Sequence, residues 1–284
     1  MDLIFRKVPQ KAVDLDMIRD FIEDENPKRI HFATYHRNAL RRIEGKENVV
    51  GRLVLPFNEP FDSIARKCLS MDSFLFPSKF GNNYYRQIFS EEEFLQEEAF
   101  IEQIKDIVFL RDTLDLSVAL SMHETEPGIR TALGEHEFRV KYRSDSTDVS
   151  ADKSALAAEM QRRLEELPYF KSSDCICAVP SRKPFMREII KSLNGFDFVD
   201  MSNQIGWKNK SGSLKDVATA EEKLDMIQSW GLRFGEDMDL NGKTVLLVDD
   251  MYQSGVTLQY IAMRMKEAGA KRVFGMTLVK SLGN

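Results

Sequence analysis

Two adjacent carboxylates, Asp249 and Asp250, stand between an apolar run and a short segment rich in hydroxyl groups and glycine. Residues 244–248 before them predict a buried strand, and residues 258–268 after them predict a helix. The connecting residues are Met251, Tyr252, Gln253, Ser254, Gly255, Val256 and Thr257. Backbone N–H groups at such a helix start, together with the hydroxyl side chains of this run, favour binding of an anion such as phosphate.

The two acids need an explanation beside an anion site, because a carboxylate repels a phosphate group. Ribose hydroxyls, which donate hydrogen bonds, suit a position between the acids and a phosphate. Gly255 would let the backbone approach such a ligand closely. The structural alternative is that Asp249 and Asp250 cap the helix and Gly255 makes the turn, but the full run favours a phosphorylated ribose.

A second strand end carries positive charge. Residues 175–179 predict a short apolar strand, and Pro180, Ser181, Arg182 and Lys183 follow it. The guanidinium and ammonium groups offer the charge that a departing pyrophosphate needs. The same residues are equally compatible with an ordinary exposed turn. The functional interpretation of this segment therefore depends on the run that begins with Asp249 and Asp250.

A polar segment between residues 203 and 223 contains three lysines, Lys208, Lys210 and Lys215. A loop of this kind could close over an active site and exclude water, with Lys210 as the candidate contact to pyrophosphate. A solvated loop without a role in binding is the alternative.

The elements that must position these residues follow a regular pattern after residue 150. The expected strands are residues 175–179, 196–201, 244–248 and 272–279, and the expected helices are residues 156–167, 186–193, 220–230 and 258–268. Such alternation is typical of parallel strands covered on both faces, so we expect an α/β fold with an open, mainly parallel sheet and helices on both faces. Ligands of such sheets bind beyond the carboxyl ends of the strands, where both candidate segments fall.

The run from residue 245 to residue 258 resembles the phosphoribosyl pyrophosphate loop of the type I phosphoribosyltransferase family. The resemblance covers about residues 150–284 and, through residues 269–273, is nearest to the ComF-like branch, although the zinc ribbon of that branch is missing because the chain has no Cys-x-x-Cys. It implies a phosphoribosyltransferase-type sheet, Mg²⁺ bridging the sugar and pyrophosphate, and no metal site made by the protein itself. The implied ligand-binding residues are Ser181, Arg182, Lys183, Lys210, Asp249, Asp250, Gln253, Ser254, Gly255, Val256 and Thr257.

The function implied by this resemblance is that of a Mg²⁺-dependent transferase of the glycosyltransferase class, acting in nucleotide metabolism. It would use phosphoribosyl pyrophosphate to form or break an N-glycosidic bond, with an unidentified nucleobase-like acceptor. Asp249, Asp250, Arg182 and Lys183 would be the catalytic residues, because the reaction needs the sugar held and the departing charge stabilised.

Gln253 departs from the pattern of the family. Oxopurine-using members place an acid at this position, where it takes a proton from the incoming base, and an amide has no useful proton affinity near neutral pH. The departure argues against a simple hypoxanthine-guanine salvage role. Two alternatives stay open: a non-catalytic module that senses phosphoribosyl pyrophosphate or a nucleotide, and a nucleotide-consuming effector in a DNA-linked process such as competence or phage defence.

The first half of the chain has a different residue pattern from the second half, and the polar segment 146–154 between them suggests a domain boundary. We expect an accessory α+β domain of unknown role at residues 1–148 and the phosphoribosyltransferase-like domain at residues 149–284. The basic stretch 28–46, with Phe32 and Tyr35 as stacking candidates, makes contact with nucleic acid a weaker option, and a solvated helix face is the simpler interpretation.

Composition sets the broad class. The chain has 284 residues, 43% of them hydrophobic, and a formal net charge of −5, which gives no global electrostatic reason to expect nucleic acid or an anionic membrane as partner. Three cysteines provide no disulfide framework, so a reducing compartment fits. Charges interrupt every apolar run and no signal peptide is recognised, so a cytoplasmic protein without membrane attachment is expected. A homodimer stays open.

Overall fold

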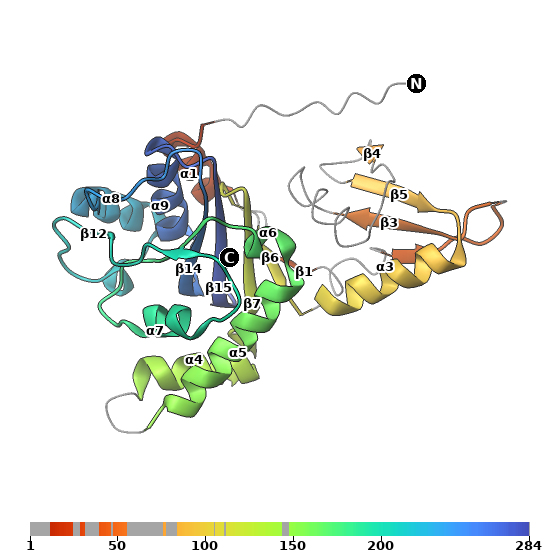
Figure 1. The fold of residues 1–284 in the computed structure, drawn as a ribbon, viewed down its shortest axis with the longest axis horizontal. Helices are drawn as coiled ribbons and strands as arrows, with labels where there is room; N and C mark the ends of the chain where they lie inside the picture. The colour runs from red at the N-terminus through yellow and green to blue at the C-terminus, as the bar shows by residue number, and fades with distance from the viewer. Residues whose placement is uncertain are drawn as a thin grey trace.

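The computed structural model describes residues 12–24, 29–31, 40–46, 48–55, 76–77, 84–104, 106–110, 112–143 and 148–283. Within these residues a seven-stranded sheet forms the centre of the molecule (Figure 1). Its strands, in order across the sheet, are β1 (Arg29–His31), β6 (Val108–Leu110), β7 (Leu116–Met122), β15 (Arg272–Lys280), β14 (Thr244–Tyr252), β10 (Cys175–Ala178) and β11 (Val199–Asp200). The strands from β7 to β11 are parallel, and β1 and β6 are antiparallel to their neighbours. The sheet is therefore mixed and mainly parallel, as expected from the sequence.

Helices cover both faces of the sheet (Figure 1). One face carries α4 (Ala132–Tyr142), α5 (Ser150–Glu166), α6 (Pro168–Lys171) and α7 (Phe185–Ser192), and the other carries α1 (Leu15–Glu23), α8 (Ala220–Trp230) and α9 (Val256–Glu267). Successive residues of β14 separate the two cores: Leu246 packs with the first group of helices and Leu247 with the second. This double burial explains the continuous apolar run of that strand.

The central sheet extends across the boundary that the sequence suggests at residue 149. Strand β7 lies before this position and pairs in parallel with β15, from Leu116 opposite Phe274 to Met122 opposite Lys280. Strands β1 and β6 also precede residue 149. We therefore propose that the unit built around this sheet begins closer to the N-terminus than residue 149.

A second, antiparallel sheet lies in the first hundred residues, beside the central sheet in Figure 1. Its order is β2 (Leu40–Arg42), β3 (Gly51–Leu55), β5 (Tyr84–Ile88) and β4 (Phe76–Pro77), followed in the chain by α3 (Glu91–Ile104). The solvated helix face suggested for residues 28–46 is wrong where the structure describes this stretch, because residues 29–31 and 40–42 are strands. Phe32 and Tyr35 lie outside the described residues. The Arg42 guanidinium pairs with Glu91 (Nη1–Oε2 2.7 Å), so this basic residue is engaged within the fold.

The expected elements of the second half are confirmed, with three differences in extent. Strand β14 runs on to Tyr252 rather than ending at Val248, since β15 continues to pair with it as far as Lys280. Strand β11 has two residues only, and α5 begins at Ser150, inside the polar segment 146–154 that suggests the domain boundary. No helix in the described part of the chain is long and apolar enough to span a bilayer.

Smaller elements connect the sheet to its helices. A short hairpin, β8 (Glu124–Glu126) with β9 (Ile129–Arg130), leads from β7 into α4. Between α7 and β14 the chain forms β12 (Ile205–Trp207), the 3-10 turn η1 (Leu214–Asp216), α8 and β13 (Leu232–Phe234), with β12 and β13 paired. These connections lie around the carboxyl ends of the parallel strands, where the candidate residues are found.

Candidate functional site

The two acids lie in the last residues of β14 rather than in a turn after it. Asp249 is opposite Thr277 of β15 across the sheet, and the backbone N–H of Asp250 donates to Asp249 Oδ1 at 2.9 Å. Desolvation and the neighbouring Asp250 charge raise the pKa of Asp249 well above its ordinary value, while the Asp250 N–H and Lys141 act against the rise. The two neighbouring carboxylates repel each other, and a hydrogen-bond donor or a cation close to them would relieve this repulsion.

Gly255 makes the tight turn between β14 and α9. Its backbone is left-handed, with φ 74° and ψ −8°, and α9 begins at the next residue. A Cβ at this position would approach Tyr252 Cε1 to 3.0 Å and the Tyr252 hydroxyl more closely still. Both the backbone conformation and the space therefore require glycine here.

Tyr252 is itself fixed by the segment before β7. Its hydroxyl donates to Asp112 Oδ2 at 3.2 Å, and Asp112 Oδ1 accepts from the Leu114 N–H and the Ser117 hydroxyl, each at 3.0 Å. Desolvation raises the pKa of Asp112 to about 6, although these donors favour its ionised form. The turn at Gly255 thus depends on residues well before the expected domain boundary.

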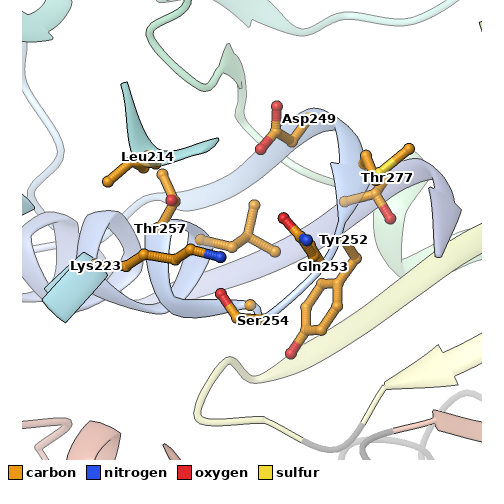
Figure 2. Close-up of a pocket in the computed structure, with 11 residues that line it drawn as sticks. Leu214, Lys223, Asp249, Tyr252, Gln253, Ser254, Thr257 and Thr277 are labelled. Atoms are coloured by element: carbon orange, nitrogen blue, oxygen red, sulfur yellow. The ribbon is translucent and has the colours of Figure 1, made fainter. Parts of the chain in front are cut away.

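A cavity of about 110 Å³ opens beside this turn (Figure 2). Its lining residues are Leu214, Lys223, Asp249, Met251, Tyr252, Gln253, Ser254, Gly255, Thr257, Leu258 and Thr277. The structure therefore brings one acid, the predicted hydroxyls and Gln253 around one space at the start of α9. Val256 differs from its neighbours, because its side chain is buried in the core and only its backbone can contact a ligand.

Lys223 of α8 belongs to this cavity although the sequence did not single it out. Figure 2 shows its amine pointing into the space that Ser254 and Gln253 also face. A lysine adds a full positive charge to the partial charges of the helix start. Lys223 is the one cationic side chain among the residues that line the cavity.

The segment 179–184 emerges beside the acids because β10 and β14 are neighbours. Ala178 is opposite Val248, and the Val179 N–H donates to the Val248 carbonyl at 2.8 Å. The side chains of Ser181, Arg182 and Lys183 are exposed at this edge. The Ser181 hydroxyl accepts from the Lys183 N–H at 3.3 Å, and the Lys183 ammonium donates to the Lys141 carbonyl at the end of α4.

Lys210 is held near the same edge. The Trp207 indole N–H donates to the Pro180 carbonyl at 3.1 Å, and Lys210 Nζ lies 5.2 Å from the centre of the Trp230 ring. Desolvation and the positive charge of Arg182 lower the pKa of Lys210, while Asp249 acts in the opposite direction. Two cations that repel each other at a sheet edge favour an anion between them.

Lys141 of α4 completes the ring of charge around the acids. Its ammonium lies 2.7 Å from Asp250 Oδ2 and 3.2 Å from Glu137 Oε1. Its position in the sequence, more than a hundred residues before Asp250, gave no signal of this contact. Across the described residues, no group of three or more His, Cys, Asp or Glu side chains could hold a metal ion.

Comparison with known proteins adds one match. Residues 155–282 match the family model described as a phosphoribosyl transferase domain. This range contains β10, β14, α9 and β15, and it leaves out β7 and α4. A search of curated proteins found no match.

Proposed function

We propose, since residues 155–282 are a domain of the phosphoribosyltransferase family, that the chain binds phosphoribosyl pyrophosphate with Mg²⁺ and transfers its ribose 5-phosphate group. The observation that carries this proposal is the acid pair at the end of β14 beside the cavity at Gly255. Acids alone would repel a phosphorylated ligand, and an anion site alone would suit any phosphate. Their combination fits a ribose whose hydroxyls and phosphate are held at once.

Each part of the ligand has a matching group. The 5'-phosphate fits the start of α9, with the Ser254 and Thr257 hydroxyls and Lys223 around it. Asp249 and Asp250 would accept hydrogen bonds from the ribose hydroxyls and lie near the positive charge that develops on the sugar as the bond to pyrophosphate breaks. Arg182, Lys183 and Lys210 would receive the departing pyrophosphate.

Magnesium would enter this site together with the ligand. The described residues offer no cluster of three ligating side chains, and Asp250 is paired with Lys141. Pyrophosphate and ribose oxygens are the hard donors that Mg²⁺ prefers. Bound in this way, Mg²⁺ would neutralise part of the charge that leaves with pyrophosphate.

Gln253 bears on the acceptor. It is exposed at the cavity, and Asp249 is the one carboxylate among the residues that line it. An amide cannot take a proton from an incoming base. The proposal is therefore transfer to or from an acceptor that needs no protein base at Gln253. The second candidate, which the same observation favours, is a module that binds phosphoribosyl pyrophosphate or a nucleotide as a signal without turnover.

Calorimetry with phosphoribosyl pyrophosphate and Mg²⁺ tests the binding step. The expected result is one site per chain, with weaker binding when Mg²⁺ is omitted because the pyrophosphate charge is then less neutralised. Incubation with a mixture of nucleobases, followed by pyrophosphate detection, tests transfer. Binding without pyrophosphate release would favour the sensing module, and absence of binding would contradict both candidates.

Substitution of Lys223 by methionine tests the phosphate part of the site. We expect about a tenfold loss of affinity for ribose 5-phosphate, since a hydrogen bond to a charged group contributes about 1.5–3 kcal/mol and solvent replaces part of it. Titration calorimetry measures the change. Lys243→Met is the matched control, because Lys243 directly precedes β14, at the opposite end of that strand from the acids. If the two variants bind ribose 5-phosphate with equal affinity, Lys223 does not contribute to the phosphate site.

A further inference from the structure

The helix α4 reaches the acid pair from outside the family-matched range. Lys141, in its last turn, has a side chain that is 15% exposed and lies 2.7 Å from Asp250 Oδ2. The carbonyl of the same residue accepts a hydrogen bond from the Lys183 ammonium. One residue therefore contacts both segments proposed to hold the ligand, the acids near the end of β14 and the basic residues after β10.

The surroundings of α4 fix Lys141 in this place. The Thr131 hydroxyl caps the helix by accepting a hydrogen bond from the Gly134 N–H at 2.9 Å. The backbone of Gly134 lies so close to the His123 carbonyl that a Cβ at this position would collide with it. The Glu137 carboxylate is fully buried between Lys141 (3.2 Å) and His123 Nε2 (3.5 Å from Oε2). A buried carboxylate needs a cation, so Glu137 holds the Lys141 ammonium on the face that meets Asp250.

Electrostatics indicate which way this contact acts. Desolvation alone would lower the pKa of Lys141, but the charges of Asp250 and Glu137 outweigh it and raise that pKa above the ordinary value of lysine. The lysine therefore stays charged, and its charge favours the ionised form of Asp249. Without this charge, the ionised form of the desolvated Asp249 carboxylate would be disfavoured further.

We propose that Lys141 is a positioning residue of the ribose site, which fixes the Asp250 carboxylate and the Lys183 ammonium in the orientation that receives the ligand. The inference rests on the proposed function. It makes α4 a part of the site, although this helix lies outside residues 155–282. It also assigns to the protein a permanent cation next to the acids, independent of the Mg²⁺ that would arrive with pyrophosphate.

The groups that face the acid pair set the expected pH dependence. Lys141 on α4 and Lys210 after β12 act on the acids directly, while Glu137 and Lys183 contact Lys141, His123 contacts Glu137, and Arg182 acts on Lys210. Carboxylates accept hydrogen bonds from ribose hydroxyls in their ionised form, and protonation at low pH removes this capacity. Lys141 acts to lower the pKa of Asp249, so its removal raises that pKa and the affinity is lost at higher pH.

The test uses the full chain and ribose 5-phosphate, titrated calorimetrically between about pH 5 and pH 8, above the ordinary pKa of aspartate. For Lys141→Met we expect at least about a tenfold loss of affinity at neutral pH and a rise of about one pH unit in the midpoint of the acid limb. Lys141→Arg should restore both. The probe's own phosphate titrates identically with every variant, so differences between variants report the protein.

Two further variants separate positioning from stability. Lys141→Met leaves Glu137 as a buried charge without its lysine, so the double variant Glu137→Gln with Lys141→Met keeps the measurement possible if the single variant is unstable. Glu137→Gln alone should weaken binding less than Lys141→Met does, because Lys141 still lies beside Asp250 but has lost the carboxylate that holds it there. Lys153→Met, which removes an α5 lysine paired with Glu188, controls for the loss of a lysine elsewhere.

The outcomes distinguish this inference from the proposed function. If wild type binds ribose 5-phosphate and the variants without Lys141 bind it equally well with an unchanged pH midpoint, the inference is overturned and the proposed function stands. An arginine variant that behaves like the methionine variant also overturns it. If wild type binds neither ribose 5-phosphate nor phosphoribosyl pyrophosphate, the proposed function fails and the inference fails with it.

Discussion

Replacing both acids at the end of β14, Asp249→Asn with Asp250→Asn, is expected to weaken binding of phosphoribosyl pyrophosphate by at least about a hundredfold. Each acid would accept a hydrogen bond from a ribose hydroxyl, and hydrogen bonds to charged groups contribute about 1.5–3 kcal/mol each. The protein should stay folded, because the substitution relieves repulsion between two adjacent carboxylates. Calorimetry of the ligand and a thermal melt of each variant measure the two effects.

Inorganic pyrophosphate supplies the control for this prediction. It has no hydroxyl donors, so removing two negative charges next to its site should leave its affinity unchanged or increase it. Asp239→Asn, at an exposed turn before β14, controls for the loss of an acid elsewhere. If the double variant retains full affinity for phosphoribosyl pyrophosphate, Asp249 and Asp250 do not bind the ribose, regardless of the affinity for inorganic pyrophosphate.

Replacing Gly255 by alanine is expected to impair both folding and phosphate binding. The left-handed backbone costs about 1–2 kcal/mol for a residue with a Cβ. The added Cβ also collides with the Tyr252 ring and hydroxyl, which must move away from Asp112, and such overpacking costs about 1–3 kcal/mol. Denaturant unfolding should show a loss of several kcal/mol, and affinity for ribose 5-phosphate should fall because the N–H groups after β14 no longer converge.

Gly242→Ala is the matched control for the backbone contribution. Gly242 has φ 72°, close to that of Gly255, but a Cβ there would meet nothing within 4 Å. It should show the smaller, backbone part of the destabilisation and no change in ligand affinity. Equal destabilisation by the two substitutions would mean that Tyr252 yields without cost and that the support from Asp112 is unimportant.

Local pattern was enough to predict the elements of the matched domain. The helix expected at residues 220–230 is α8, which begins with a capping box between Thr219 and Glu222 that fixes its start. The expected strand at residues 196–201 pairs only at Val199 and Asp200, because its neighbour β10 begins at Cys175 opposite Val199. Element type is encoded locally, whereas the length of a strand depends on where its partner begins.

The candidate site was predictable where its residues are contiguous and not where the fold assembles them. Asp249, Ser254 and Thr257 lie in one continuous segment, residues 249–257, so spacing alone placed them together. Lys223 reaches the cavity from a neighbouring helix, and Lys141 reaches Asp250 from a helix on the other face of the sheet. Their sequence contexts resemble those of ordinary surface lysines. Only the packing of α8 and α4 on the sheet distinguishes them.

The position of β15 between β14 and β7 has a consequence for the order of assembly during synthesis. Strand β7 is made early, yet its parallel neighbour is β15, about 150 residues later in the chain. Until β15 emerges from the ribosome, the edges of β7 and β14 that will flank it have no partner. Such distant pairing slows folding and leaves strand edges open to other chains. The nascent protein should therefore depend on chaperone protection until β15 closes the sheet.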